Sequence, residues 1–266
     1  MTAEPAIRIR DASLRFGDRS LWSGLNLDVA PGEFLAVLGP NGSGKTSLLK
    51  VLLGQQRLNA GSVRLGRDGI GYIPQQGAVE SALTVRGTDL VGLGLDGHRW
   101  GTGLRGSAER KRRVAAAIDA VGAGSFARQP LALLSGGEQQ RLRVAQALVG
   151  EPEVLLCDEP LLSLDLNHQR AVSELVDRRR READTAVLFV THEINPILSY
   201  VDKLLYLVDG KFSIGSPAEV MNSASLSELY GTKVEVIRIG GQIHVAGMHS
   251  ELCEDHPHHH PAEEVS

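Results

Sequence analysis

Residues 39–46 read Gly-Pro-Asn-Gly-Ser-Gly-Lys-Thr and follow an apolar run at 34–38. The glycines let successive backbone N–H groups converge on phosphate oxygens, and a following helix adds the positive end of its dipole. At this spacing Lys45 would bridge the β- and γ-phosphates, and the Thr46 hydroxyl would bind Mg²⁺. A glycine-rich turn that merely ends a strand explains the glycines but not the adjacent lysine and threonine. The pattern predicts a nucleoside triphosphate site made by Gly39, Pro40, Asn41, Gly42, Ser43, Gly44, Lys45, Thr46 and Ser47.

A second apolar run, at 154–157, ends in Asp158 and Glu159. Ligand-facing residues lie at the C-terminal ends of buried parallel strands, so Asp158 is expected to hold Mg²⁺ directly or through water. Glu159 is expected to polarise the water that attacks the γ-phosphate. A solvated acidic turn after a strand is the alternative, which the phosphate-binding pattern disfavours.

Residues 134–141, Leu-Ser-Gly-Gly-Glu-Gln-Gln-Arg, are expected to open a helix. Ser135 is a suitable N-cap, and Gly136 and Gly137 expose backbone N–H groups, which makes this helix start a second anion site. One chain therefore carries two phosphate-binding devices.

The composition limits the class of protein. A chain of 266 residues that are 42% hydrophobic can form one large domain or two lobes with a core. The net charge of −4 gives no general attraction to nucleic acid. Cys157 and Cys253 lie far apart, so we expect no disulfide and a reducing compartment. The chain opens without a signal-peptide pattern, and its apolar runs are shorter than the ~20 residues that span a bilayer. Any action at a membrane would therefore need spans from another subunit.

The order of local patterns predicts an α/β fold. Short strands are expected over 7–9, 13–16, 25–29, 34–38, 61–65 and 69–73, with a helix from the phosphate-binding loop to about Gly54. Helical periodicity covers 84–93, 108–121 and 137–148, with a glycine-rich loop over 92–106. Strand and helix patterns then alternate over 154–157, 167–181, 186–190, 194–199 and 203–208, which indicates a parallel sheet covered by helices. A helix over 223–230 and a hairpin of 234–239 and 242–245 follow.

In their order and spacing, the three motifs resemble those of the ATP-binding subunit of ABC transporters, over about residues 7–222. The resemblance implies a P-loop NTPase (RecA-like) core with a β-rich N-terminal subdomain and an inserted α-helical subdomain. The expected parts are 1–76 and 151–222 for the core, 77–150 for the helical subdomain, 223–248 for a C-terminal appendage and 249–266 for a disordered tail. The resemblance also implies a homodimer or pseudo-dimer joined head to tail. There, the signature residues of one subunit close over the ATP of the other; they are Ser135, Gly136, Gly137 and Glu138.

The resemblance also assigns roles outside the three motifs. Phe16 would stack on adenine, with a core aromatic as the alternative, and Gln75 would touch Mg²⁺ and water, with Gln76 as a neighbouring candidate. Asp165 would lie in the loop between subunits, and His192 would contact the γ-phosphate, with a structural histidine as the alternative. The implied catalytic residues are Gln75, Glu159 and His192, and the implied Mg²⁺ ligands are Thr46, Gln75 and Asp158.

The implied activity is ATP hydrolysis coupled to transport at the cytoplasmic face of the plasma membrane. The implied partners are polytopic permease subunits and, indirectly, an extracytoplasmic solute-binding protein, with no nucleic acid. Segments 69–94 and 229–236 resemble subunits of zinc or manganese uptake systems. The tail residues His256, His258, His259 and His260 suit Zn²⁺, although a polar tail without metal is the alternative.

Other functions and features stay open at this point. Iron-chelate or other small-solute transport, export and a soluble ABC-type ATPase are alternatives, and a kinase or GTPase is disfavoured by the signature motif. The arginine-rich runs at 110–113 and 178–181 are interpreted as solvated helix faces.

Overall fold

The computed structural model describes residues 4–66, 69–75, 85–96 and 107–247. A six-stranded sheet in the order β5-β6-β7-β3-β8-β9 forms its frame. Five of these strands run parallel: β5 (Ile70–Ile73), β6 (Val154–Asp158), β7 (Ala186–Val190), β3 (Phe34–Leu38) and β8 (Lys203–Val208). The edge strand β9 (Lys211–Gly215), which the sequence patterns did not predict, pairs antiparallel with β8. None of the helices within the described ranges is long and apolar enough to cross a membrane.

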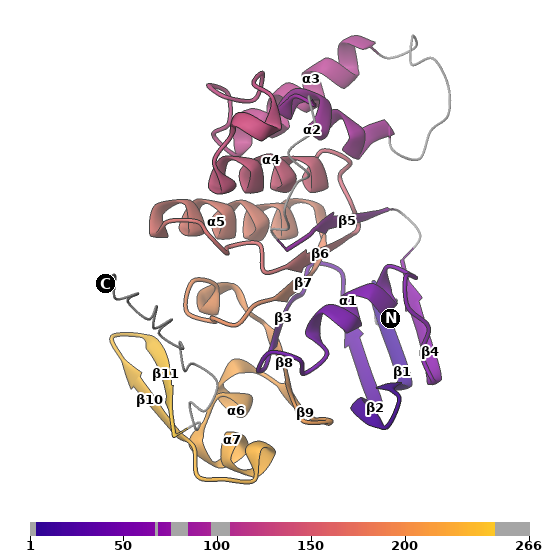
Figure 1. The fold of residues 1–266 in the computed structure, drawn as a ribbon, viewed down its shortest axis with the longest axis vertical. Coiled ribbons are helices and arrows are strands. Elements are labelled where there is room, and N and C mark those ends of the chain that lie inside the picture. The colour runs from indigo at the N-terminus through magenta and orange to yellow at the C-terminus, as the bar shows by residue number, and fades with distance from the viewer. Residues whose placement is uncertain (1–3, 67–68, 76–84, 97–106, 248–266) are drawn as a thin grey trace, which may run out of the picture.

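The central strands are buried on both faces, which is why they read as continuous apolar runs. Along β3, Phe34 and Ala36 enter one hydrophobic core, whereas Leu35 and Val37 enter another. The first core continues into the helices above the sheet and into the C-terminal appendage (Figure 1). The second is completed by the N-terminal strands and by α1 (Lys45–Leu52). The sheet is therefore packed on both faces, and these two cores fix the positions of its strands.

The N-terminal strands form a three-stranded antiparallel sheet in the order β2-β1-β4. Its members are β2 (Arg19–Val29), β1 (Ile7–Phe16) and β4 (Ala60–Leu65). The prediction of two short strands over 7–9 and 13–16 is wrong, because β1 is continuous. Its register shifts between Ile9 and Ala12, where Asp11 has a φ of +45°, so the polar interruption is a bulge and not a turn.

Four helices lie together at the top of Figure 1: α2 (Gly87–Asp96), α3 (Ser107–Ala120), α4 (Gly136–Leu148) and α5 (Leu166–Ala183). The loop expected over 92–106 begins later than predicted, since α2 runs through Gly92 and Gly94. A Cβ at Gly94 would lie 2.1 Å from the Gln146 carbonyl oxygen of α4. The glycine therefore serves close helix packing here. Residues 97–106 lie outside the described ranges.

The segment expected to be helical over 194–199 has only a 3₁₀ turn, Leu198–Tyr200, and another such turn, Leu131–Leu133, precedes α4. Pro196 has no backbone N–H to donate, and the segment is too short to offset that loss.

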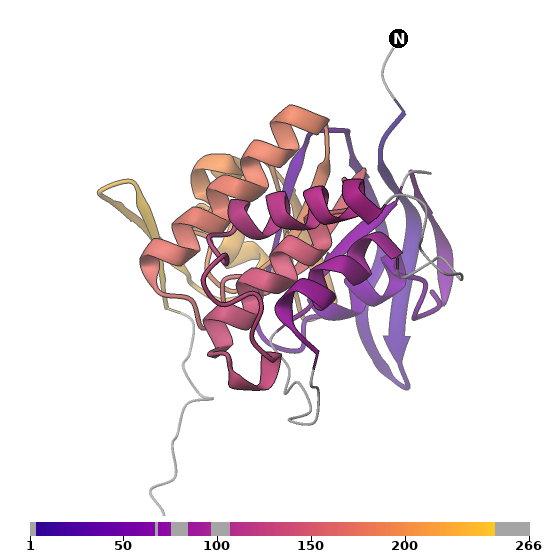
Figure 2. The same ribbon diagram turned by 90° about the horizontal axis from the view of Figure 1, so that it is seen from above.

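The C-terminal appendage contains α6 (Pro217–Val220), which was not predicted, then α7 (Ser223–Tyr230), β10 (Glu235–Ile239) and β11 (Gln242–Ala246). The hairpin prediction is confirmed: Gly240 and Gly241 have φ values of +58° and +81°, as a two-residue turn of type I′ requires. In Figure 2 the hairpin and the N-terminal sheet lie on opposite sides of the molecule. The histidine-rich tail lies outside the described ranges.

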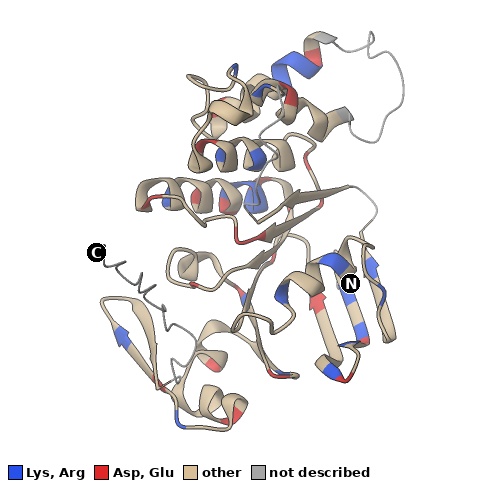
Figure 3. Ribbon diagram, viewed as in Figure 1, with Lys and Arg blue, Asp and Glu red and all other residues tan. Residues whose placement is uncertain are grey.

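The arginine-rich run of α5 is a solvated face only in part, since Arg178 and Arg181 are exposed but Arg180 is not. Figure 3 shows basic and acidic residues interspersed along this helix. The Arg180 side chain is only 12% exposed and bonds Asp177 at 2.8 Å, Asp202 at 2.6 Å and the Gly32 carbonyl oxygen at 2.9 Å. On α3, by contrast, Arg112 is 76% exposed and pairs with Glu109, so that part of the run is solvated.

Arg180→Ala is expected to lower the free energy of unfolding by about 2–3 kcal/mol, because it removes one partner of the buried Asp177 carboxylate and the bonds to Asp202 and to the Gly32 carbonyl oxygen. Arg181 keeps one bond to Asp177, at 3.0 Å, which limits the loss. Urea denaturation measures it. Arg170→Ala is the matched control, since Arg170 is 81% exposed and its pair with Glu174 should contribute less than ~0.5 kcal/mol. Equal losses in the two variants would contradict the structural role of Arg180.

Candidate active site

The phosphate-binding loop connects β3 to α1 and is built on glycines that no other residue replaces easily. Gly39, Gly42 and Gly44 have φ values of +140°, +77° and +100°. Gly44 is the N-cap of α1 and makes no side-chain cap, so the first N–H groups of the helix are left for another acceptor. The Ser43 hydroxyl is buried and has no hydrogen-bond partner among the described residues. Such donors fit the phosphate oxygens of ATP.

Gly39→Ala is expected to weaken ATP binding by more than about tenfold, because a strained loop conformation costs on the order of 1–3 kcal/mol. A Cβ at residue 39 would lie 2.1 Å from the Leu207 carbonyl oxygen. Titration with a fluorescent ATP analogue measures the effect. Gly54→Ala is the matched control. Gly54 also has a positive φ, +70°, but open space around it, so a loss of ATP binding in Gly39→Ala alone would be due to crowding at residue 39. If both variants bind ATP as the native chain does, the loop does not need this close backbone contact.

Lys45 lies inside the loop at 7% exposure. Its Nζ donates to the Gly39 carbonyl oxygen at 2.7 Å and to that of Pro40 at 3.0 Å. Burial lowers the pKa of the Lys45 ammonium, whereas the nearby carboxylates of Glu159 and Asp158 act to raise it. The ammonium is thus held by the loop that would wrap around the phosphates.

Two oxygen ligands from distant segments meet beside this loop. The Thr46 hydroxyl, in the first turn of α1, donates to Asp158 Oδ1, at the end of β6, over 3.3 Å. Asp158 is 2% exposed, and burial raises its pKa while the Thr46 bond acts to lower it. A buried carboxylate next to a hydroxyl is the oxygen donor set that suits Mg²⁺. When bound, Mg²⁺ would neutralise phosphate charge.

Glu159 and His192 are in direct contact. The Glu159 side chain is 12% exposed, and its Oε2 lies 2.7 Å from His192 Nδ1. An ionised carboxylate only accepts, so Nδ1 carries the proton and Nε2 remains for another contact. The Glu159 backbone N–H donates to the Val190 carbonyl oxygen at 3.0 Å, and its φ is +49°. The parallel pairing of β6 with β7 therefore sets the two side chains against each other.

Phe16 ends β1 with 54% exposure, so the alternative of a core aromatic is wrong. It pairs across the turn with Arg19, whose Nη2 donates to the Gly42 carbonyl oxygen at 3.0 Å. Phe16 therefore lies close to the phosphate-binding loop, where an adenine ring could stack. The sequence did not predict the contact of Arg19 with the loop. The only signal was that Arg19 lies two residues after Gly17.

Gln75 is exposed and lies two residues beyond β5. In the parallel pairing of β5 with β6, Ile73 is opposite Cys157, so the chain beyond Ile73 continues at the edge that carries Asp158 and Glu159. Gln76 lies outside the described ranges.

The signature residues are in a different part of the chain. Ser135 caps α4 as predicted: its hydroxyl donates to Glu138 Oε2 at 2.8 Å and accepts from the Glu138 N–H at 3.4 Å. Hydrogen bonds from the Ser135 backbone and hydroxyl lower the pKa of Glu138. Figure 1 shows α4 among the upper helices, apart from α1. Within one chain, the signature residues therefore do not join the phosphate-binding loop.

Two further residues, Asp165 and Gln140, make contacts around the site. Asp165 caps α5 by accepting from the His168 N–H at 2.9 Å, and its other oxygen lies 2.6 Å from His168 Nδ1. Gln140, which is fully buried on α4, donates from Nε2 to the Pro160 carbonyl oxygen at 3.2 Å. The helix of the signature motif is thus bonded to the residue that follows Glu159, a link that sequence reasoning missed.

A parallel sheet with a phosphate-binding loop at one strand end and paired acidic residues at another defines a P-loop NTPase. The family model for ABC transporters matches residues 22–162, more than half of the chain, and the chain therefore belongs to the ABC transporter family as an ATP-binding domain. It is an ATPase of the kind that is coupled to transport.

Solved structures agree with this assignment. The chain is 26% identical to a transporter assigned to the metal-chelate type and solved in an inward-facing conformation, with a TM-score of 0.78 over 91% of this chain and 96% of that one. It is 25% identical to the cassette MJ0796, solved as a dimer after hydrolysis with ADP and Pi, with a TM-score of 0.67 over 78% and 97%. It shares the fold of cbiO1 from Clostridium perfringens, part of the cbiONQ transporter complex, at 23% identity and a TM-score of 0.70 over 85% and 94%.

The predicted tail metal site is a separate matter. Among the described residues, no three His, Cys, Asp or Glu side chains are grouped as a metal site would need. His256, His258, His259 and His260 lie outside the described ranges, so Zn²⁺ binding there stays a prediction.

Proposed function

We propose that the chain hydrolyses ATP through Glu159, with His192 at the γ-phosphate, Lys45 on the phosphates, and Thr46, Asp158 and Gln75 around Mg²⁺. The observation that carries this proposal is the 2.7 Å contact between Glu159 and His192 at the edge of the sheet that also holds Lys45 and Asp158. A base and a proton-bearing partner, placed beside a phosphate-binding loop, suit activation of water for attack on a phosphoryl group.

Closure of a head-to-tail dimer is the second part of the proposal. Two helix starts suited to anions lie in separate parts of one chain, which two chains placed head to tail would bring together. Leu133, beside the signature residues, is 74% exposed, and Leu166, beside Asp165, is 82% exposed. Apolar side chains at both places support contact with another subunit. MJ0796, a cassette with which this chain shares 25% identity, was solved as a dimer, which supports the pairing of two such chains.

The cargo we propose is a divalent transition metal, zinc or manganese, imported through permease subunits at the cytoplasmic face of the plasma membrane. A solute-binding protein would deliver the metal from outside. The histidine-rich tail has the imidazole ligands that such metals prefer. Transport of a metal chelate is the second candidate, and it is favoured by the likeness to a transporter assigned to the metal-chelate type over 91% of this chain.

Uptake measurements distinguish these cargoes. Cells that lack this chain should lose uptake of radioactive zinc or manganese, and the native chain should restore it, whereas the Glu159→Gln variant should not. Loss of iron-chelate uptake with unchanged zinc and manganese uptake would replace the first cargo by the second. Unchanged uptake of all three would reject both.

A further inference from the structure

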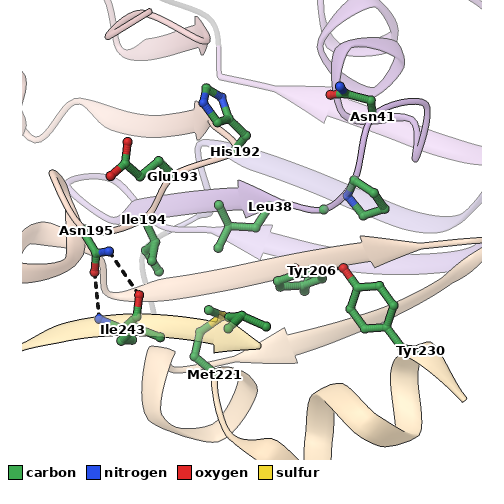
Figure 4. Close-up of a pocket in the computed structure, with 13 residues that line it drawn as sticks. Leu38, Asn41, His192, Glu193, Ile194, Asn195, Tyr206, Met221, Tyr230 and Ile243 are labelled. Atoms are coloured by element: carbon green, nitrogen blue, oxygen red, sulfur yellow. Dashed lines mark hydrogen bonds between the residues drawn. The ribbon is translucent and has the colours of Figure 1, made fainter. Parts of the chain in front are cut away.

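A cavity of about 360 Å³ separates the phosphate-binding loop from the C-terminal appendage. Pro40 and Asn41 line it on the side of the loop, and Met221, Tyr230 and Val245 line it on the side of the appendage. The segment from His192 to Asn195 lines a further side of the cavity and leads to Ile243 of β11, as Figure 4 shows. This segment therefore connects the appendage to the candidate active site.

Asn195 joins this segment to the hairpin of β10 and β11. Its Nδ2 donates to the Ile243 carbonyl oxygen at 3.1 Å, and its Oδ1 accepts from the Ile243 N–H at 2.8 Å, as the dashed lines in Figure 4 show. The side-chain amide thus pairs with both polar groups of one strand residue. Ile243 is only 4% exposed and belongs to the core that lies under the helices, so it is a firm anchor.

The segment is also fixed at its other end. Thr191, which is 4% exposed, donates from its hydroxyl to the Glu193 carbonyl oxygen at 3.1 Å and accepts from the Glu193 N–H at 3.2 Å. His192 lies between these two anchors and has a side chain that is 58% exposed, with its Nδ1 against Glu159. Because little packing surrounds the imidazole, its orientation depends on how the backbone on both sides is held.

The hairpin does not rely on Asn195 for its own position. The Tyr206 and Tyr230 hydroxyls lie 3.1 Å apart, and Arg238 donates to the Met221 carbonyl oxygen at 3.2 Å. Leu226, Leu229 and Val234 are buried in the core. The loss of the Asn195 amide should therefore loosen the segment at His192 and leave the appendage folded.

We propose that Asn195 is a positioning residue, through which the hairpin of β10 and β11 holds His192 in its orientation against Glu159. This inference rests on the proposed roles of Glu159 and His192. It gives the C-terminal appendage a function in hydrolysis, because any displacement of the hairpin reaches the catalytic contact through Asn195.

The test is ATP hydrolysis by the full chain with saturating Mg²⁺. Asn195→Ala should lower kcat by on the order of tenfold and leave KM for ATP within about twofold, as expected when only the orientation of a catalytic group changes. Asn222→Ala is the matched control, because Asn222 caps α7 in the same appendage and does not bond the segment of His192. Its kcat should stay near native. An equal loss in both variants would overturn the proposal in favour of a general loosening of the appendage.

A double mutant shows whether Asn195 acts through His192. In single-turnover assays, Asn195→Ala should have little further effect in a His192→Ala background, because the group that it positions is gone. The same loss in both backgrounds would overturn the proposal. An unchanged rate in His192→Ala alone would reject the proposed role of His192, which is a distinct result.

Asn195→Asp covers the case in which the alanine variant unfolds. A protonated carboxyl group can donate to the Ile243 carbonyl oxygen as the amide does, whereas an ionised carboxylate cannot. The kcat of this variant, relative to the native chain, should therefore rise as the pH is lowered. A ratio that is independent of pH would overturn the proposal.

Discussion

Glu159→Gln is expected to lower ATP turnover by at least about a hundredfold, which is the usual contribution of a positioned general base. The amide cannot take the proton of the attacking water, but its oxygen can still accept from His192 Nδ1, which lies 2.7 Å from the native carboxylate. ATP affinity should stay within about threefold of native, because the contact that is lost belongs to the transition state. Phosphate release and titration with a fluorescent ATP analogue measure the two quantities.

The same variant should also hold ATP in a closed dimer, since the step that reopens the dimer is blocked. Size-exclusion chromatography with ATP and Mg²⁺ would show the dimer peak. Glu174→Gln is the matched control, because Glu174 is an exposed carboxylate on α5 that pairs with Arg170. Turnover by Glu159→Gln at the native rate would reject Glu159 as the base.

Lys45→Met is expected to weaken ATP binding by about 10–100-fold, because a hydrogen bond to a charged group contributes about 1.5–3 kcal/mol. In the absence of nucleotide, the variant should lose little stability. Burial lowers the pKa of Lys45, which means that the ammonium is held at a cost that methionine does not carry, and this gain offsets the loss of the hydrogen bonds to the Gly39 and Pro40 carbonyl oxygens.

Two measurements on the same variant separate these effects. Titration with a fluorescent ATP analogue gives the affinity, and thermal unfolding without nucleotide gives the stability. Lys211→Met provides a control at an exposed position on β9 and should change neither. A variant that binds ATP normally would contradict the role of Lys45 in the phosphate site. A variant that loses stability in proportion to affinity would show that Lys45 is needed for the fold.

The parts of the fold that could be predicted are those that depend on neighbouring residues. Continuous apolar runs identified β3, β6 and β7, and the acidic pair at the end of β6 followed from the same pattern. The turn of the C-terminal hairpin could be predicted because two adjacent glycines determine it. In these places the local conformation and the tertiary packing favour the same structure.

Predictions failed where the deciding contact comes from far along the chain. Gly94 is helical because its missing side chain admits α4, and the Arg180 side chain is largely withdrawn from solvent because it bonds Asp202 and Gly32. Within the site, the loop, the acidic pair and His192 could be located from the sequence. The bonds of Asn195 to Ile243 join residues 48 positions apart, and no local pattern reveals them.

The backbone of Glu159 has a φ of +49°, a conformation that glycine or asparagine adopts at lower cost than glutamate. The backbone conformation at position 159 therefore favours glycine or asparagine, whereas the proposed role in hydrolysis requires glutamate. Selection for thermostability alone should enrich glycine or asparagine there, and the selected variants would lose the carboxylate. An engineering library for a more heat-resistant transporter should for this reason keep codon 159 constant and seek stability elsewhere in the chain.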